Sequence, residues 1–136
     1  MIYPTNVKNQ CSIAIPNPIT PTKFNTSITI PNSVKTIGSS AFYNCDSLTS
    51  VTFGENSQLT SIGSYAFYDC SSLTSIIIPD SITSMGKSVF YNTGYYNNED
   101  NWENGVLYIS KHLIQAKTSI SGSYTIKEST LTIVDY

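Results

Sequence analysis

Three copies of one segment dominate this sequence. In each copy a glycine is followed four residues later by a phenylalanine, and the glycines of successive copies are separated by 25 and then 23 residues. A repeat period in the twenties is typical of a solenoid, because a single coil cannot bury its own apolar side chains without neighbours above and below it. We therefore expect a stack of similar coils around one apolar interior. The recurring residues are Gly38, Gly63 and Gly86 with Phe42, Phe67 and Phe90.

The apolar pattern within a copy predicts a short strand on one side of the coil. In the runs Leu48–Phe53 and Leu73–Ile78, apolar residues occupy the first, fourth and sixth places, so the last three residues alternate inward, outward and inward. Proline follows this strand at Pro31 and Pro79 and ends it, because proline has no amide hydrogen to donate. Strands in equivalent places of successive coils should pair in parallel, about 4.8 Å apart.

The rest of each copy returns along the opposite side of the coil. A second apolar pair lines that side, Val34 with Ile37 in the first copy and Ile82 with Met85 in the third. The recurring glycine then allows a tight turn. The pair that follows, Ala-Phe in two copies and Val-Phe in the third, predicts a short helical turn whose ring fills the coil. The expected fold class is an α/β repeat solenoid with a strand face and a turn-rich back.

The pattern IPxSVxxIGxxAFxxCxxLxxV, read from Ile30 to Val51, closely resembles the BspA-like class of leucine-rich repeats, which occurs in surface proteins of anaerobic bacteria and mucosal protozoa. The resemblance covers residues 28–94 and, in part, residues 122–136. It implies a right-handed leucine-rich-repeat-like stack of short parallel strands with short helical turns. It also implies a secreted or wall-attached protein that works by adhesion, without catalysis.

The stretch from Tyr95 to Ser123 departs from the repeat. Its first part is polar and turn-forming, whereas residues 106–109 and 113–116 read as two strands. We predict a loop and β-hairpin insert, which the family resemblance also implies. The predicted parts are residues 1–27 as an N-terminal cap or degenerate half-repeat, 28–94 as three repeats, 95–121 as the insert, and 122–136 as the start of a truncated further repeat. We therefore expect this chain to be a piece of a longer protein.

The sparse charge argues against several other classes of protein. Charged residues make up 12% of the chain, arginine is absent and the net charge is -2, so the basic patch of a nucleic-acid binder is missing. The sequence also lacks the run of roughly 18 to 20 apolar residues that spans a membrane. We expect no nucleic-acid partner, no membrane insertion of this segment, an extracellular or cell-surface location, and a monomer when the segment is isolated.

The cysteines allow two readings. Cys45 and Cys70 occupy the same place in successive copies, so their α-carbons should lie about 5 Å apart, a distance that a disulfide can span. A recurring cysteine is also a small buried apolar side chain, and the third copy has Thr93 at this place. We favour the reduced form. With three cysteines, no CxxC pair and a single histidine, the chain offers no zinc site.

The sequence contains no clear catalytic constellation. The single histidine, His112, falls in the predicted hairpin turn, where we expect a solvated side chain and not a general base. The acidic trio Glu99, Asp100 and Glu103 offers carboxylate oxygens to calcium, but its spacing matches no EF-hand, and a solvated charged loop explains it more simply. We therefore expect a protein that is not an enzyme and needs no cofactor.

The surface remains as the place of function. Outward positions of the predicted strands carry mostly hydroxyl groups, and two tyrosines stand at the start of the insert, where aromatic side chains with a polar handle suit recognition. The alternative is that the strand residues are merely acceptable at exposed positions and that the aromatics pack the insert against the last regular coil. The candidate binding residues are Thr29, Ser50, Thr52, Ser75, Ile77, Thr125, Tyr95 and Tyr96.

These features favour a non-catalytic binding module of a larger cell-surface or secreted protein. Its expected partner is a host or microbial surface protein or glycan, because many modest contacts along an array combine into avidity. Two alternatives stay open. In the first, the segment is a passive structural spacer. In the second, it is a calcium-dependent carbohydrate-binding segment that uses the acidic insert.

Overall fold

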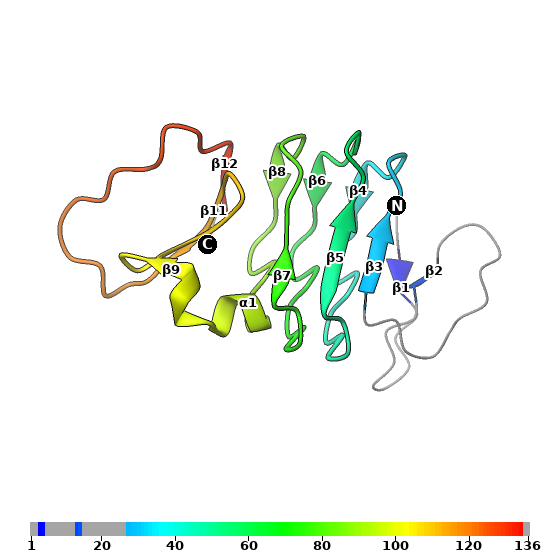
Figure 1. The fold of residues 1–136 in the computed structure, drawn as a ribbon, viewed down its shortest axis with the longest axis horizontal. Helices are drawn as coiled ribbons and strands as arrows, with labels where there is room; N and C mark the ends of the chain where they lie inside the picture. The colour runs from blue at the N-terminus through cyan, green and yellow to red at the C-terminus, as the bar shows by residue number, and fades with distance from the viewer. Residues whose placement is uncertain (1–2, 5–12, 15–26, 135–136) are drawn as a thin grey trace.

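Short parallel strands lie side by side along the long axis of the molecule (Figure 1). The computed structural model describes residues 3–4, 13–14 and 27–134. One sheet has the order β3–β5–β7, formed by β3 (Ser27–Ile30), β5 (Ser50–Phe53) and β7 (Ser75–Ile76). The other has the order β4–β6–β8, formed by β4 (Thr36–Ile37), β6 (Ser61–Ile62) and β8 (Ser84–Met85). The predicted stack of short parallel strands is confirmed.

The interior of the stack is a column of phenylalanine rings. The ring centroids of Phe42 and Phe67 lie 4.9 Å apart with planes 7° from parallel, and those of Phe67 and Phe90 lie 5.5 Å apart at 5°. All three rings are at most 1% exposed. Aromatic pairs in such stacks contribute about 0.5–1.5 kcal/mol beyond the burial of their area. The column therefore favours coils of the same shape, because each ring must meet an equivalent ring in the next coil.

The recurring glycines are needed because successive coils come very close together. Neither Gly63 nor Gly86 has a positive φ, so the left-handed freedom of glycine is not used there. A Cβ atom on Gly63 would instead lie 2.4 Å from the backbone nitrogen of Ser39, and one on Gly86 would lie 2.4 Å from that of Ser64. The sequence predicts a tight turn at these positions, whereas the structure shows that the missing side chain makes room for the neighbouring backbone.

The segment that contains the Ala-Phe pair is not helical, so the predicted helical turn is wrong for the repeats. The amides of Ala41 and Tyr43 donate to carbonyl groups three residues earlier, at 3.2 and 3.1 Å, as in reverse turns. The amide of Phe42, between them, donates to the carbonyl of Ala66 in the next coil at 2.7 Å. A helix would use every amide within its own coil, whereas this alternation leaves every second amide free to join two coils.

Residues with left-handed backbone make this alternation possible. Two positions in each turn have φ between 51° and 59°, one two residues after the glycine and one two residues after the phenylalanine. Asparagine or aspartate occupies the second position in all three coils, and these residues tolerate that conformation better than most others. The residues concerned are Ser40, Tyr65 and Ser88 at the first position, and Asn44, Asp69 and Asn92 at the second.

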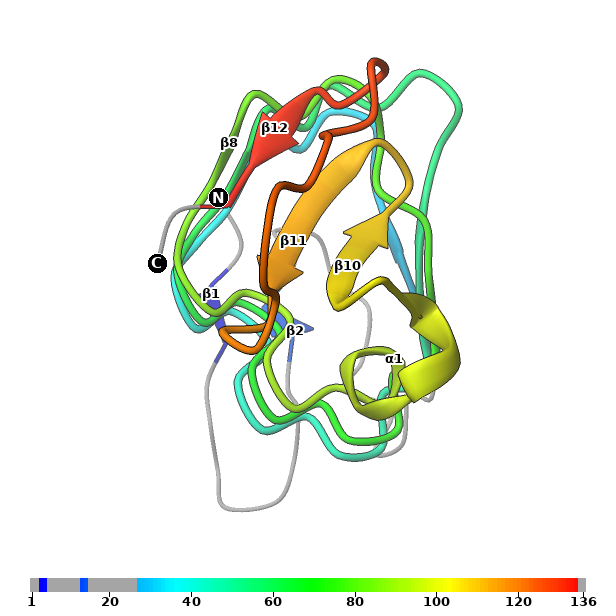
Figure 2. The ribbon, with the colours of Figure 1, turned by 90° about the vertical axis from the view of Figure 1, so that its left-hand side faces the viewer.

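A separate sheet lies across one end of the stack (Figure 2). It follows the helix α1 (Gly94–Asn97) and the 3-10 helix η1 (Glu99–Asn101), and its strand order is β12–β11–β10–β9. Its strands are β9 (Trp102–Glu103), β10 (Val106–Ile109), β11 (His112–Ala116) and β12 (Thr132–Ile133). β10 and β11 pair antiparallel, and β12 pairs in parallel with β11. The status of this segment as an insert stays a prediction, as do the predicted domain boundaries.

Most of the predicted N-terminal cap, residues 1–27, lies outside the described residues, and so does Cys11. Within it the structure gives two short strands, β1 (Tyr3–Pro4) and β2 (Ile13–Ala14), which pair antiparallel.

The close approach of the coils predicts that Gly63→Ala destabilises the protein strongly. The added methyl group would overlap the backbone near Ser39, which cannot move without separating the coils, so we expect a loss of about 3 kcal/mol in the free energy of unfolding. Ser84→Ala, at an exposed position of β8, should change it by less than about 0.5 kcal/mol. Urea unfolding monitored by circular dichroism measures both. Equal stability of the two variants would contradict this account of the glycine.

Candidate functional site

The strands β3, β5 and β7 hold four of the predicted binding residues, and a fifth, Ile77, directly follows β7. The register sets Ser50 opposite Ser75 and Thr29 opposite Thr52, so equivalent side chains form rows across the sheet. The hydroxyl oxygens of Thr29 and Thr52 lie 2.9 Å apart, and the Thr52 hydroxyl also donates to the carbonyl of Ile28 at 3.2 Å. Ile77 continues the threonine row without a hydroxyl group, and its side chain is 75% exposed.

A hollow of about 550 Å³ lies on this face, within the range of about 300–1,000 Å³ that is usual for ligand sites. Its floor and walls come from β5, from β7 and from the segments that follow each strand. We call it the strand-face groove. It is lined by Ser50, Val51, Thr52, Phe53, Gly54, Glu55, Ser57, Ser75, Ile76, Ile77, Ile78, Pro79, Asp80 and Ser81.

The groove opens where two neighbouring strands stop pairing. β3 and β5 pair over four residues, whereas β5 and β7 pair over two, Ser50 with Ser75 and Val51 with Ile76. Between Phe53 and Ile62 the second coil has two residues more than the first coil has between Ile30 and Ile37. We call these additional residues the extension of the second coil. The second and third coils meet again at Thr60, whose carbonyl accepts a hydrogen bond from the amide of Thr83 at 2.9 Å. The extension therefore leaves the stack intact, while the segments that follow β5 and β7 are separated at the groove.

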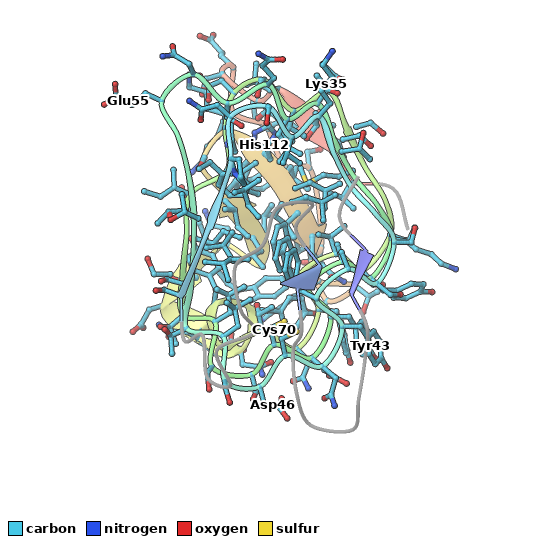
Figure 3. The ribbon with its side chains drawn as sticks, turned by 90° about the vertical axis from the view of Figure 1, so that its right-hand side faces the viewer. Lys35, Tyr43, Asp46, Glu55, Cys70 and His112 are labelled. Atoms are coloured by element: carbon cyan, nitrogen blue, oxygen red, sulfur yellow. The ribbon has the colours of Figure 1, made fainter. Side chains whose placement is uncertain are left out.

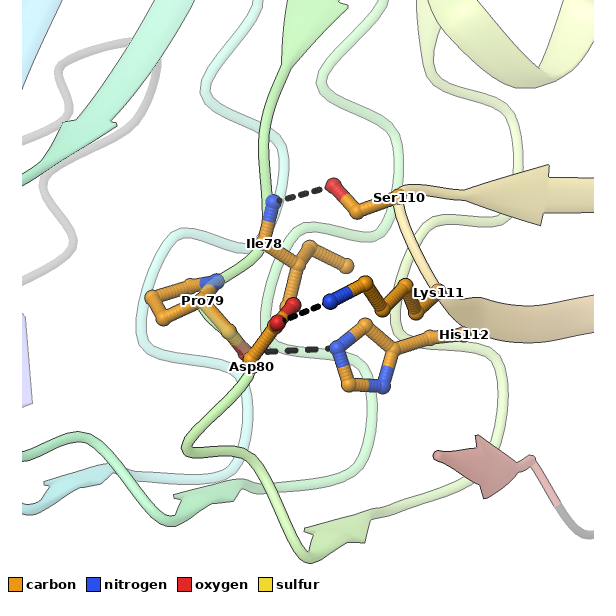
Figure 4. A network of polar contacts seen from close by, with 6 residues as sticks. All are labelled: Ile78, Pro79, Asp80, Ser110, Lys111 and His112. Atoms are coloured by element: carbon orange, nitrogen blue, oxygen red, sulfur yellow. Dashed lines mark hydrogen bonds and ion pairs between the residues drawn. The ribbon is translucent and has the colours of Figure 1, made fainter. Parts of the chain in front are cut away.

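The third coil is held at the groove by the turn between β10 and β11 (Figure 4). The hydroxyl of Ser110 accepts a hydrogen bond from the amide of Ile78 at 3.0 Å. The ammonium group of Lys111 forms an ion pair with Asp80. The Nε2 atom of His112 lies 3.2 Å from the carbonyl oxygen of Pro79. These three contacts fix the backbone that forms one wall of the groove.

His112 is buried, so the expectation of a solvated turn residue is wrong. It is 0% exposed, since it is the first residue of β11 and faces the last regular coil. The Pro79 carbonyl can only accept a hydrogen bond, so Nε2 carries the hydrogen and Nδ1 accepts from the hydroxyl of Thr132 at 2.8 Å. Burial lowers the pKa of His112 below its usual value, and the Pro79 carbonyl opposes that shift only in part. The ring is neutral and joins three parts of the chain.

The other three predicted binding residues lie away from the strand-face groove. Thr125 is exposed beside a different hollow, lined among others by Glu103, Ile120 and Lys127. The hydroxyl of Tyr95 donates to the carbonyl of Tyr108 at 3.1 Å, and its ring packs against the core.

Tyr96 is half-buried, and its ring lies 5.1 Å from the ring of Tyr91 and 5.1 Å from that of Trp102. Trp102 is also half-buried, packs against the core and donates its indole hydrogen to the Tyr96 carbonyl at 2.8 Å. A role of Thr125, Tyr95 and Tyr96 in binding stays a prediction.

A row of stacked tyrosines, which was not predicted from the sequence, lies on the turn side of the coils. The centroid distance is 5.2 Å from Tyr43 to Tyr68 and 5.1 Å from Tyr68 to Tyr91. Tyr43 is 39% exposed and Tyr91 is 41% exposed. The signal is present in the sequence, because each phenylalanine of the column is followed directly by a tyrosine. The faces of these rings cover one another, so mainly their edges and hydroxyl groups meet the solvent.

Cys45 and Cys70 are not joined to each other, but Cys45 is disulfide-bonded, so the favoured reduced form is wrong for Cys45 and confirmed for Cys70. Cys70 is a free thiol, fully buried, and its sulfur donates to the carbonyl of Phe42 at 3.0 Å. Burial raises the pKa of the Cys70 thiol to about 12. This thiol therefore stays protonated at neutral pH and packs as an apolar group.

The acidic trio of the predicted insert is largely engaged with lysines. Glu99 forms an ion pair with Lys117, and Glu103 forms one with Lys127. Within residues 3–4, 13–14 and 27–134, no group of three histidine, cysteine, aspartate or glutamate side chains is placed to hold a metal ion. In the same part of the chain, no helix has the length and apolar character needed to cross a membrane.

Comparison with known proteins gives one match. The family model of the BspA type leucine rich repeat region, in 6 copies, matches residues 11–136. No curated protein and no solved structure matches the chain.

The buried, neutral His112 predicts a loss of stability in mild acid. Its pKa is lowered in the folded state, while the unfolded chain keeps an ordinary value of about 6.5, so the unfolded state takes up the proton first. The free energy of unfolding should therefore fall as the pH drops below about 6.5. Urea titrations at pH 7.5, 6.5 and 5.5 measure this decline. His112→Gln should show a flatter profile, because no other histidine is present, and parallel profiles would contradict the assignment.

Proposed function

Because the chain belongs to the BspA-type leucine-rich repeat family, we propose that it is a non-catalytic binding module of a cell-surface or secreted protein. The family is a repeat module often found in surface proteins. The module adheres to a protein or glycan on a host or microbial surface. The site of adhesion is the face that carries β3, β5 and β7.

The strand-face groove is the observation that supports this proposal most directly. A solenoid coil that only supports its neighbours needs no hollow on its strand face, yet here one of about 550 Å³ lies among four of the predicted binding residues, Ser50, Thr52, Ser75 and Ile77. The hydroxyl groups of Ser50 and Ser75 at its edge can donate and accept hydrogen bonds, the Thr52 hydroxyl already donates within the sheet, and the exposed Ile77 offers apolar area. A rigid sheet presents these groups without the entropic cost of ordering a loop on binding.

The repeated architecture also suits adhesion. A solenoid presents equivalent positions at a fixed spacing, so a partner with several copies of its own motif can engage several coils at once. Individual contacts can then be weak, because the second contact forms at the high effective concentration set by the first.

The proposal predicts that binding is lost when the strand face becomes positively charged. In Thr52→Lys/Ile77→Lys, two ammonium groups stand where a partner must approach, and their desolvation should weaken binding at least about tenfold. Arrays of glycans and of extracellular-matrix proteins, probed with the labelled chain, identify the partner and measure the loss.

Ser84→Lys is the matched control, because Ser84 is exposed on β8 of the other sheet and should leave binding unchanged. The passive spacer makes the opposite prediction, namely that no array partner responds to the change on the strand face. That result would refute the binding module.

A further inference from the structure

We propose that the strand-face groove holds an extended peptide segment of a partner protein, with an aliphatic side chain on Ile77 and Phe53 and a lysine or arginine side chain at Glu55. This inference rests on the proposed function and names the chemistry of the partner. Three features of the groove lead to it: its apolar floor, the sign of its charges and the rigidity of its walls.

The apolar part of the groove centres on Ile77. The equivalent positions in the two preceding coils are Thr29 and Thr52, so the third coil exposes a branched aliphatic side chain where the others expose a hydroxyl group. Phe53, half-buried and packed against the core, lines the same hollow. Covering one aliphatic side chain contributes roughly 1.5–3 kcal/mol when burial is complete. The groove therefore favours a ligand that brings an aliphatic group of its own.

The charges of the groove have one sign. Glu55 and Asp80 are the charged residues in its lining, and both are carboxylates. Asp80 already forms an ion pair with Lys111, which lies outside the lining. Glu55 is exposed and, among the residues that the structure describes, forms no ion pair. Figure 3 shows Glu55 projecting from one corner of the coil into open space. The free carboxylate favours a cationic group on the ligand and disfavours an anionic one.

A peptide supplies both groups in one chain. In an extended peptide alternate side chains point to the same face, so residues two apart bring an aliphatic and a basic side chain to the same surface. Acidic glycans are repelled by Glu55, and neutral glycans carry no cation to meet it. The combination of Ile77 with Glu55 therefore favours a basic and aliphatic peptide over a sugar chain.

The walls of the groove are fixed before a ligand arrives. β5 is paired with β3 over its whole length, and Ile78 to Asp80 are held by Ser110, Lys111 and His112 (Figure 4). The ligand then does not have to order the site, which lowers the cost of binding. An extended peptide can lie beside β5 and the residues that follow β7, which line the groove.

The test uses three labelled hexapeptides and the whole chain. The first has the sequence Thr-Thr-Ile-Thr-Lys-Thr with blocked ends, and the others carry glutamine or glutamate in place of the lysine. Fluorescence polarisation in low salt should give tightest binding for the lysine peptide, about two- to fivefold tighter than the glutamine peptide, and weakest binding for the glutamate peptide. Shifts of the backbone amide signals of Thr52 and Ile77 in nuclear magnetic resonance spectra locate the contact.

Two substitutions separate the contributions of charge and apolar area. Glu55→Gln should make the lysine and glutamine peptides bind equally, whereas Asp46→Asn removes an exposed carboxylate from the far side of the coil and should keep their difference (Figure 3). Ile77→Thr restores the residue type of the other two coils, so it should fold normally and weaken all three peptides about fivefold to tenfold.

Three results would overturn the proposal. The first is equal binding of the lysine and glutamine peptides to the unmodified chain, and the second is an equal effect of Glu55→Gln and Asp46→Asn. The third is saturation of the Thr52 and Ile77 signals by a neutral oligosaccharide such as chitohexaose, with no response to the peptides. The third result assigns the groove to a glycan and leaves the binding module intact, whereas the module itself fails only in the array experiment with Thr52→Lys/Ile77→Lys.

Discussion

The close approach of successive coils is the constraint on which the rest of this structure depends. It brings the Phe42 and Phe67 rings to 4.9 Å and allows the amide of Phe42 to reach the carbonyl of Ala66 at 2.7 Å. It also forbids a side chain at Gly63, whose Cβ would lie 2.4 Å from the neighbouring backbone. Each coil is thus shaped by the coils on both sides. A coil can differ from its neighbours only at residues that do not take part in the phenylalanine column, the strand pairing or the glycine contacts between coils.

The sequence predicts the phenylalanine column and the parallel strands well, but it predicts the turn that contains the Ala-Phe pair poorly. Periodic apolar residues fix which side chains face inward, so the phenylalanine column and the parallel strands follow from spacing alone. The Ala-Phe pair is compatible with a helical turn, and apolar spacing does not distinguish a helix from two reverse turns over so few residues. The distinguishing signal is the asparagine or aspartate after each Phe-Tyr pair, at Asn44, Asp69 and Asn92, which suits a left-handed backbone.

The candidate site is predictable in part for the same reason. Alternation along a strand places Thr29, Ser50, Thr52, Ser75 and Ile77 at outward positions, and the structure puts the first four on one sheet and Ile77 directly after β7. The groove itself is not predictable, because it results from a difference between two coils and from contacts with residues about thirty positions away. Ser110 meets Ile78, and His112 meets Pro79 and Thr132, across separations that no local pattern reports. This is also why the sequence places His112 in solvent although it is buried.

Regular and irregular parts of the stack have different roles. In the regular rows a group can be satisfied by its equivalent in the next coil, as the hydroxyls of Thr29 and Thr52 are at 2.9 Å. Such groups have less capacity left for a ligand. Ile77 has no hydroxyl to join this row, and Glu55 lies in the extension of the second coil. Both are exposed, and neither is satisfied by an equivalent residue in another coil. The departures from the repeat therefore carry the features that an outside partner can use, while the repeat supplies the rigid frame that holds them in place.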